Sequence, residues 1–472
     1  MIEVRIEEVL TSTGAQLVHG DARRRALGIS TDTRTLRRGA LYVALSGPSF
    51  DGNDFALEAA RRGAAGLMLR GPLAAVSAVL PGLAPDVPVL LHAEPRRALS
   101  DLACWHRARL DAPVIGITGS CGKTTTKNIL VELLAHGRRV VGSPDSFNND
   151  IGVPHTLFLA DAATQALVVE MGTNHPGEIA ALCRTARPTG GIITNVGAAH
   201  LEGLQSLEGV AREKGELAAS LPASGFCVLN AHCPWTPRLR SMTSARVVTF
   251  SVEGEGDLNA TEPWFHSGGT TVRLEGREIT FPLLGLHNAQ NLLAALAACR
   301  ALGIELDDVL PAVSRLKAER RRMERLQAGE LSIFDDTYNA NPDSARASLR
   351  VLAGLHGYRR RVLVLGDMLE LGETAAELHH RFGAEAAASG LDLLVLVGEL
   401  SRATAAGALE AGLPAARTVH FADTDAALAE VPALLAPGDV VLVKASRRIG
   451  LERLVRRLVE QAGGAQVAQG GT

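Results

Sequence analysis

The feature that most constrains this chain is an apolar strand that runs through a glycine-containing turn directly into a helix. Residues 114–118 (Val-Ile-Gly-Ile-Thr) form the predicted strand, and a helix is expected from Lys123 to about His136. Small residues in such a turn let backbone N–H groups close around phosphate oxygens, and the helix N-terminus adds a favourable dipole. The segment 118–125 (Thr-Gly-Ser-Cys-Gly-Lys-Thr-Thr) is therefore interpreted as a phosphate-binding loop, in which Lys123 reaches the β- and γ-phosphates and Thr124 ligates Mg²⁺.

The match to the general phosphate-loop pattern is incomplete. The pattern G-x-x-x-x-G-K-[ST] would place its first glycine at position 117, where Ile117 stands. The alternative interpretation is a glycine-rich turn that binds no ligand. The flanking strand and helix favour phosphate binding.

More apolar runs that end in polar residues follow the loop, at 166–170, 191–195 and 226–230. Continuous rather than alternating apolar strands are typical of a parallel sheet covered on both faces. Residues 245–285 are predicted to be β-rich and antiparallel, and His287 to Leu302 to be an apolar helix.

A second series of strands and helices occupies the last third of the chain, with strands at 361–366, 391–398 and 440–444. We interpret it as a doubly wound unit. Before the phosphate loop, a strand at 41–45 and helices at 55–62 and 95–109 indicate a smaller α/β unit.

The fold class is therefore α/β with three domains. The predicted parts are a small N-terminal α/β domain (1–110), a central P-loop parallel-sheet ATPase-like domain (111–320), a C-terminal Rossmann-like doubly wound domain (321–462) and a frayed tail (463–472).

Composition agrees with this division and excludes several classes of protein. A length of 472 residues suits about three domains, and 46% hydrophobic residues exclude a mainly disordered or fibrous protein. A net charge of −3 argues against a dedicated nucleic-acid binder. No apolar run approaches the roughly 18 residues of a membrane span, and the acidic start does not resemble a signal peptide, so we expect no membrane insertion. Six cysteines without a CxxC pair are read as reduced thiols in the cytoplasm.

Two scarce residue types indicate where function lies. Lysine occurs only at 123, 127, 214, 317 and 444, so positions that stay lysine in an arginine-rich chain are of interest. Asparagine disfavours helices and strands, so clusters of it indicate turns or ligand contacts. Eight of the asparagines fall in short clusters: Asn148, Asn149, Asn174, Asn195, Asn288, Asn291, Asn339 and Asn341.

Three further residues follow strands whose carboxyl ends meet the phosphate loop. Glu170 ends its strand and is placed to hold Mg²⁺, whereas the alternative is a solvated strand end. His200 lies after the next strand, although a lone histidine is more often structural. Lys214 would by itself be read as an exposed helix lysine.

Several segments together make the chain resemble the Mur ligase family of ATP-dependent amide-bond-forming enzymes. The family's short loop T-G-x-x-G-K-T fits Thr118 to Thr124 without a glycine at 117. The remaining matches are 147–154, 170–179, 285–291 (an H-N-x-x-N helix start), 322–324, 335–344, 444–447, 30–34 and 44–55. Two departures are Arg321 and Ala445, which each replace a glycine of the family pattern.

The block 335–344 (Asp-Asp-Thr-Tyr-Asn-Ala-Asn-Pro-Asp-Ser) is the most discriminating, because D-D-x-Y-N-A-N-P is typical of the member that adds D-alanyl-D-alanine. The resemblance implies ligation of D-alanyl-D-alanine to the carboxylate of UDP-N-acetylmuramoyl-tripeptide through an acyl phosphate, with release of ADP and phosphate. ATP is then a substrate, Mg²⁺ the cofactor, and the expected product the pentapeptide precursor of peptidoglycan. A cytoplasmic monomer is expected.

The resemblance also implies roles for residues. The catalytic residues would be Lys123, His200 and Lys214. The metal ligands would be Thr124, Glu170, His200 and Lys214, the last as a carbamate. A carbamate needs a neutral amine, so Lys214 should be partly buried with a lowered pKa. ATP would contact Gly119, Ser120, Cys121, Gly122, Lys123, Thr124, Thr125, Asn288, Asn291, Arg322, Asp336 and Asn339. The UDP-sugar and peptide substrates would contact Ser30, Thr31, Asp32, Thr33, Arg34, Ser46, Gly47, Asp51, Asn149 and Asn341.

Two alternatives stay open at this point. One is the same chemistry with another acceptor, as in a folylpolyglutamate synthase-like enzyme or another member of the family. The other is a regulatory nucleotide-binding protein that hydrolyses little, which Glu170, His200 and Lys214 together argue against. If the protein is a ligase, we expect the third domain to close on ATP and bring Arg322, Asp336 and Asn339 to the site.

Overall fold

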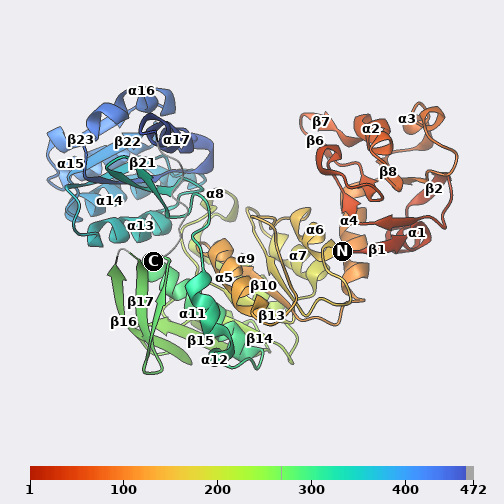
Figure 1. The fold of residues 1–472 in the computed structure, drawn as a ribbon, viewed down its shortest axis with the longest axis horizontal. Helices are drawn as coiled ribbons and strands as arrows, with labels where there is room; N and C mark the ends of the chain where they lie inside the picture. The colour runs from red at the N-terminus through yellow and green to blue at the C-terminus, as the bar shows by residue number, and fades with distance from the viewer. Residues whose placement is uncertain (267, 464–472) are drawn as a thin grey trace.

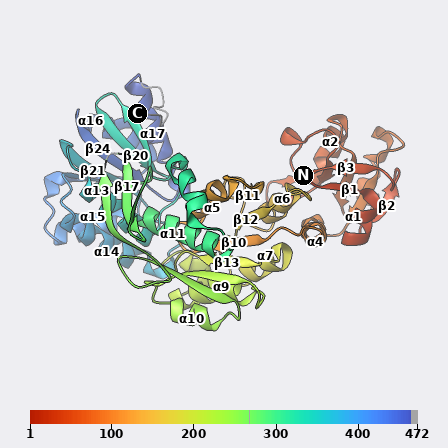
Figure 2. The same ribbon diagram turned by 60° about the horizontal axis from the view of Figure 1, so that its bottom comes forward.

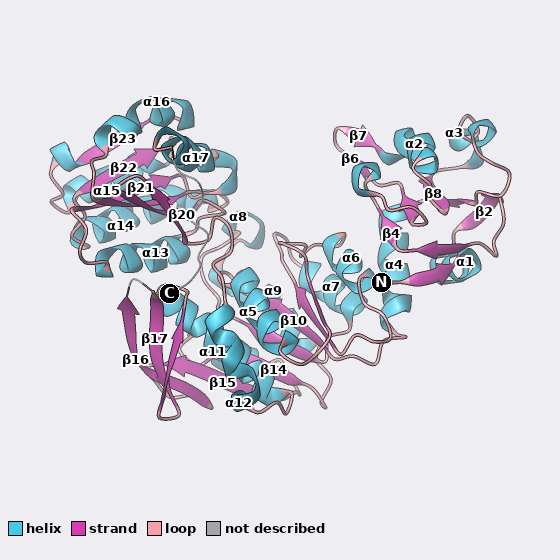
Figure 3. Ribbon diagram, viewed as in Figure 1, coloured by secondary structure: helices cyan, strands magenta, loops and turns pink. Residues whose placement is uncertain are grey.

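Three main sheets organise the chain in a computed structural model, which describes residues 1–266 and 268–463. Figure 1 shows the N-terminal part on the right and the C-terminal part at the upper left, with the central part between them. The view in Figure 2, turned by 60°, shows the same separation between the two outer parts. The predicted α/β class is confirmed, since each main sheet packs against helices (Figure 3).

The N-terminal part contains a five-stranded sheet of order β2-β9-β8-β5-β4. Its strands and those of two separate two-stranded sheets, β1-β3 and β6-β7, are β1 (Glu3–Arg5), β2 (Gln16–His19), β3 (Arg25–Leu27), β4 (Ile29–Ser30), β5 (Leu41–Val43), β6 (Ser46–Gly47), β7 (Phe50–Asp51), β8 (Gly66–Arg70) and β9 (Val89–His92). Its helices are α1 (Ile6–Thr13), α2 (Ala56–Arg61), α3 (Leu73–Val76) and α4 (Pro95–Arg107), with 3-10 turns at Thr33–Thr35, Gly52–Phe55 and Leu80–Gly82.

The central sheet has nine strands in the order β11-β12-β10-β13-β14-β15-β16-β17-β18. They are β10 (Val114–Thr118), β11 (Val140–Gly142), β12 (Ala166–Glu170), β13 (Gly190–Ile193), β14 (Phe226–Asn230), β15 (Arg246–Val252), β16 (Leu258–His266), β17 (Gly269–Leu274) and β18 (Arg277–Phe281). The helices are α5 (Lys123–Ala135), α6 (Gly152–Phe158), α7 (Glu178–Ala186), α8 (Leu201–Leu204), α9 (Leu207–Ala219), α10 (Thr236–Ser241), α11 (Leu286–Ala301) and α12 (Leu306–Val309), followed by a 3-10 turn at Leu310–Arg315.

The antiparallel prediction for 245–285 is wrong for its first part. The pairs β14–β15 and β15–β16 are parallel, and only β16, β17 and β18 pair antiparallel. Helix α10 lies between β14 and β15 in the chain. It returns the chain to the edge of the sheet where β14 began, so β15 runs parallel to β14. The parallel sheet thus extends further than the sequence pattern indicated.

The C-terminal part has a six-stranded sheet of order β19-β20-β24-β21-β22-β23, in which only β19 runs antiparallel to its neighbour. The strands are β19 (Glu324–Ala328), β20 (Leu331–Asp336), β21 (Arg360–Gly366), β22 (Leu393–Val397), β23 (Thr418–Phe421) and β24 (Asp439–Lys444). The helices are α13 (Pro342–Gly354), α14 (Ala375–Ala388), α15 (Ser401–Glu410), α16 (Thr424–Leu434) and α17 (Glu452–Gln461), with 3-10 turns at Gly372–Thr374, Ala415–Arg417 and Arg447–Ile449.

Apolar cores lie on both faces of the central sheet, as a parallel sheet requires. One core joins α5 and α11 to the sheet, and α11 is buried on almost all sides, which suits a helix that is apolar all round. The other core continues into the N-terminal part, where Ile2 and Val4 join Val153 and Leu157. The boundary at 110/111 therefore crosses a continuous core, and the division into domains stays a prediction.

Two expectations from the sequence concern the C-terminal tail and membrane-spanning helices. The predicted frayed tail covers residues 463–472. Of these, Gly463 is described, and residues 464–472 lie outside the described residues. Within the described ranges, no helix combines the length and apolarity needed to cross a bilayer.

Candidate active site

The phosphate-loop candidate is a tight turn between β10 and α5 that only glycine can build at two positions. Gly119 has φ +148° and Gly122 has φ +82°. A Cβ atom on Gly119 would lie 1.9 Å from Thr194 Oγ1, and one on Gly122 would lie 2.3 Å from Asn291 Oδ1. Helix α5 then begins at Lys123 without a side-chain cap, so its first N–H groups are available to an anion.

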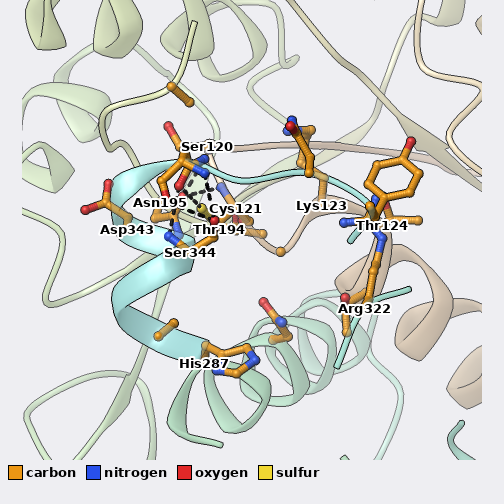
Figure 4. Close-up of a pocket in the computed structure, with 18 of the residues that line it drawn as sticks. Ser120, Cys121, Lys123, Thr124, Thr194, Asn195, His287, Arg322, Asp343 and Ser344 are labelled. Atoms are coloured by element: carbon orange, nitrogen blue, oxygen red, sulfur yellow. Dashed lines mark hydrogen bonds between the residues drawn. The ribbon is translucent and has the colours of Figure 1, made fainter. Parts of the chain in front are cut away.

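Asn195, just after β13, holds the turn in shape. Its Oδ1 accepts hydrogen bonds from the backbone N–H groups of Ser120 and Cys121, at 3.0 and 2.9 Å. Thr194 Oγ1 donates to the carbonyl of Cys121 at 2.5 Å, and Ser120 Oγ donates to the carbonyl of Gly197. Figure 4 shows this network beside the first residues of α13. The turn is therefore preorganised by the neighbouring strand end.

Lys123 folds back over the turn. Its Nζ donates to the carbonyl of Gly119 at 2.8 Å, and burial lowers the pKa of its amine. A nearby carboxylate, Glu170, favours the charged form. The ammonium thus lies where a phosphate anion would meet it.

Glu170 is a buried carboxylate with an unused oxygen. Its residue is 1% exposed, and Oε1 accepts a hydrogen bond from Asn148 Nδ2 at 2.8 Å. Oε2 is buried and has no hydrogen-bond partner within the described part of the chain. A buried, half-satisfied carboxylate beside a phosphate turn fits a divalent cation, because Mg²⁺ prefers oxygen ligands of this kind. The alternative of a solvated strand end is wrong.

His200 lies in a strained turn at the N-terminus of α8, with φ +56°. Its Nδ1 is 2.6 Å from Oε2 of Glu370, which comes from the C-terminal part of the chain. The predicted site histidine is therefore in contact with a carboxylate that the sequence reasoning did not single out.

Lys214 is buried in α9 and not exposed, so the reading as a surface lysine is wrong. It is 1% exposed, and burial, followed by the charge of Lys123, lowers the pKa of its amine to about 7. The expected burial and lowered pKa are confirmed. Lys214 is not among the residues that line the cleft described below, and its role as a carbamate stays a prediction.

Residues after 320 reach the phosphate turn. The guanidinium of Arg322 stacks over the Tyr338 ring at 3.8 Å. Its Nη2 donates to Thr124 Oγ1 at 2.9 Å, and Figure 4 shows these two residues side by side. Asn341 caps α13 and accepts from Cys121 Sγ at 3.3 Å. The carboxylate of Asp343 accepts from the N–H of Ala198 at 3.0 Å. The C-terminal part thus docks on the turn through the start of α13.

Asp336 and Asn339 contact Lys444. The ammonium of Lys444 donates to Asp336 Oδ2 at 2.6 Å and to the carbonyl of Asn339 at 3.0 Å. Ser348 Oγ donates to the same carboxylate oxygen of Asp336. Asp336 is therefore paired inside its own domain.

A chain of polar hydrogen bonds joins α11 to the first turn of α5. Asn291 Oδ1 accepts from Thr126 Oγ1, Asn291 Nδ2 donates to Asn288 Oδ1, and Asn288 Nδ2 donates to the carbonyl of Leu284. His287 lies at the start of the same helix, where burial lowers its pKa to about 4. Its ring is consequently neutral at physiological pH.

One cleft of about 1470 Å³ lies between the central and C-terminal parts. This volume exceeds the roughly 300–1,000 Å³ of a pocket for one small ligand, so there is room for a nucleotide and a second reactant. The predicted site residues that line it are Ser120, Cys121, Gly122, Lys123, Thr124, Thr125, Asn149, Glu170, His200, Asn288, Asn291, Arg322, Asp336, Asn339 and Asn341. All eight clustered asparagines line it as well.

The predicted substrate residues of the N-terminal part do not line this cleft. They lie instead in the small domain, around the end of β4 and the 3-10 turn Thr33–Thr35 and on the pair β6–β7. There Asp32 pairs with Arg34 at 2.7 Å, and Ser46 Oγ donates to Asp51 at 3.1 Å. Thr31 Oγ1 lies 3.0 Å from Nε2 of His155 in α6, which links this domain to the central one. The remaining members of this set are Ser30, Thr33 and Gly47.

The sequence reasoning missed residues that support the site through long-range contacts. The asparagine clusters pointed to Asn148 and Asn195 without giving them a role. No sequence signal pointed to Glu370. Within the described ranges, no group of three or more His, Cys, Asp or Glu side chains gathers as a ready-made metal site.

Comparisons with known proteins agree over nearly the whole chain. A family model described as the Mur ligase middle domain matches residues 117–299, and one described as the Mur ligase, glutamate ligase domain matches 321–447. The UDP-N-acetylmuramoyl-tripeptide–D-alanyl-D-alanine ligase of Escherichia coli is 37% identical over 98% of this chain and 99% of its own length. The ligase of the same name from Bacillus subtilis is 34% identical over 92% of this chain and 93% of its own length.

Solved structures give the same picture. A crystal structure of MurF from Acinetobacter baumannii superposes with a TM-score of 0.86 at 28% identity and covers 98% of this chain and 99% of its own. MurF ligase from Thermotoga maritima in complex with ADP superposes with a TM-score of 0.78 at 27% identity, covering 92% of this chain and 98% of its own.

Proposed function

Since the chain belongs to the Mur ligase family, we propose that it joins D-alanyl-D-alanine to the terminal carboxylate of UDP-N-acetylmuramoyl-tripeptide, with conversion of ATP to ADP and phosphate. The product is the pentapeptide precursor of peptidoglycan. The observation that carries the proposal is the cleft in which Lys123, Glu170 and Arg322 meet, in a chain 37% identical to a ligase of that name.

The first step transfers the γ-phosphoryl group to a carboxylate. A carboxylate oxygen of the tripeptide attacks the γ-phosphorus, the bond from that phosphorus to the β–γ bridging oxygen breaks, and ADP leaves. Bringing an anion to a polyanion is the main obstacle, since one unit-charge pair at 4 Å repels by about 4 kcal/mol at an effective dielectric of 20. The ammonium of Lys123 and the uncapped N-terminus of α5 offset this repulsion.

The second step forms the amide bond. The amine of D-alanyl-D-alanine attacks the acyl carbon and loses a proton. The C–O bond to phosphate then breaks, and inorganic phosphate departs with one oxygen of the former carboxylate. Alignment of three reactants contributes up to about 7–11 kcal/mol, and the residues after 320 that reach the cleft supply part of that alignment.

Mg²⁺ is the cofactor in this proposal. The unpartnered Oε2 of buried Glu170 supports it. Two ions would be held by Thr124, Glu170, His200 and carbamylated Lys214, and the Lys214 carbamate would help to hold the second. When bound, Mg²⁺ neutralises phosphate charge and stabilises the charge that develops in phosphoryl transfer.

The parts of the chain take separate roles in the proposal. Residues 1–110 bind the UDP-sugar through the segments 30–34 and 46–51, residues 111–320 bind ATP, and residues 321–462 close over the nucleotide. The contacts of Arg322 and Asn341 with the phosphate turn support a docked third domain. Because the reaction uses ATP and a UDP-linked peptide, we propose that it takes place in the cytoplasm. We also propose that the enzyme acts as a monomer.

Product analysis tests the proposal. The protein is incubated with UDP-linked tripeptide, ATP, Mg²⁺ and a panel of D,D- and L,L-dipeptides, and products are identified by mass spectrometry. We expect a pentapeptide product with D-alanyl-D-alanine and one ADP for each amide bond. Lys123→Ala should abolish turnover without unfolding the protein, whereas Lys317→Ala, at an exposed lysine, should leave it unchanged. ATP consumption without a joined peptide would contradict the proposal.

A further inference from the structure

A carboxylate of the C-terminal domain contacts the site histidine of the central domain. Oε2 of Glu370 lies 2.6 Å from Nδ1 of His200, and the carbonyl of Glu370 accepts a hydrogen bond from the N–H of Glu202 at 3.3 Å. Figure 1 shows α8, which follows His200, reaching towards the C-terminal domain, and α8 contacts the 3-10 turn Gly372–Thr374. Both the side chain and the backbone of Glu370 therefore join the two domains.

Both partners sit in strained backbone conformations. His200 has φ +56° and Glu370 has φ +64°, which lie in the left-handed region that residues with a side chain rarely adopt. Such strain persists only where the surrounding structure enforces it, and it concentrates at functional sites. The two strained residues lie in different domains and face each other.

The segment 366–372, which carries Glu370, is held in place by buried contacts within the C-terminal domain. The N–H of Met368 donates to Nε2 of His379, the N–H of Leu369 donates to Ser446 Oγ, and the carboxylate of Asp367 accepts from the N–H of Ser401. Met368 is fully buried and His379 is 0% exposed. The segment is therefore a rigid support that presents Glu370 at a set position.

The contact selects one tautomer of His200. An ionised glutamate can only accept hydrogen bonds, and a partly exposed glutamate is ionised at neutral pH. The hydrogen of the neutral imidazole must then lie on Nδ1, which leaves the lone pair on Nε2. That is the form in which a histidine can bind a cation through Nε2 while a carboxylate orients the ring.

We infer that Glu370 is a positioning residue of the proposed ligase reaction. When the C-terminal domain is docked, Glu370 holds His200 through Nδ1, so that Nε2 is the ring nitrogen whose lone pair is available to the reaction. This inference rests on the proposed function, because His200 must act in that reaction. An ordinary surface ion pair would contribute little to stability and would leave the ring chemistry unchanged.

Two readouts test the inference, in wild type, Glu370→Ala and the matched control Glu373→Gln, a substitution at an exposed glutamate three positions along. The first is the ¹⁵N NMR signature of His200 at pH 8 in nucleotide-free protein labelled on histidine, assigned with His200→Gln. The second is the Mg²⁺ concentration that gives half-maximal ligation, measured with the KM for the UDP-linked substrate.

We expect the wild type and Glu373→Gln to show a hydrogen on Nδ1 and a bare Nε2. Glu370→Ala should show a mixture of tautomers and a half-saturating Mg²⁺ concentration raised about 10- to 100-fold, with an unchanged KM for the UDP-linked substrate. Circular dichroism confirms that the variant folds. A wild-type tautomer or a wild-type Mg²⁺ response in Glu370→Ala would overturn the inference. Absence of product from the wild type would instead refute the proposed function, while the NMR measurement still reads the His200–Glu370 contact.

Discussion

Lys214 gives a sharp chemical test, because its amine is almost completely buried in α9. Burial, with a contribution from the charge of Lys123, lowers its pKa to about 7. An ordinary lysine with a pKa of about 10.4 has roughly one neutral amine in a thousand at pH 7.5, whereas a pKa of about 7 leaves roughly three quarters neutral. The form that reacts with CO₂ is thereby enriched roughly 600-fold.

We predict that Lys214 carries a carbamate above about pH 7. The protein is equilibrated with ¹³C-bicarbonate at pH 8 in the presence of Mg²⁺ and ADP, and carbamate carbon is detected by ¹³C NMR. One labelled carbamate should appear, be lost in Lys214→Ala, and remain in Lys317→Ala. Ligase activity should fall in CO₂-depleted buffer and return with bicarbonate, and short-chain carboxylates should partly rescue Lys214→Ala. A spectrum without any signal that depends on Lys214 would refute this reasoning.

The same lysine predicts a pH dependence of stability. Between pH 7 and about 10.4 the unfolded chain binds more protons at this position than the folded chain, so the free energy of unfolding should rise with pH across that window. Lys214→Met should flatten the slope, as measured by urea denaturation at several pH values. An equal slope in both proteins would contradict a lowered pKa.

Substitutions also test three further features. Gly122→Ala forces a side chain into φ +82°, with its Cβ 2.3 Å from Asn291 Oδ1. The resulting strain of about 1–2 kcal/mol should raise the KM for ATP about 5- to 30-fold. An unchanged KM would count against the turn as the nucleotide site. Asn341→Ala removes the cap of α13 and should lower the free energy of unfolding by about 1 kcal/mol in urea titrations, whereas an unaltered midpoint would show the cap to be dispensable. Asp439→Ala removes a fully buried partner of Arg360 and should lower the free energy of unfolding by about 2–3 kcal/mol. The control Asp425→Ala, in an exposed pair with Arg453, should lower it by less than about 1 kcal/mol. Equal losses in the two variants would contradict the burial argument.

Local patterns predicted those elements whose signals lie within a few residues. The strand at 114–118, the start of α5 at Lys123 and the apolar helix α11 follow from short stretches of sequence. The direction of β15 does not, because it depends on where α10 returns the chain. Strand pairing is a long-range property that the apolar pattern of a segment leaves open.

The same distinction applies to the site. Residues of the phosphate turn were recognisable because their chemistry depends on adjacent positions. Asn195 acts on a turn about 75 residues before it, and Glu370 contacts a histidine 170 residues away. Scarce asparagines gave a hint for Asn195, since all eight clustered ones line the cleft. An ordinary glutamate in an arginine-, glutamate- and alanine-rich chain carries no such hint.

The central claim is that a carboxyl oxygen of the peptide receives the terminal phosphoryl group of ATP held at the turn 119–125. Its most direct test uses UDP-linked tripeptide labelled with ¹⁸O in the terminal carboxylate, followed by mass spectrometry of the released phosphate. We expect one ¹⁸O atom in the phosphate for each amide bond formed. Phosphate without ¹⁸O, with its new oxygen drawn from water, would contradict it.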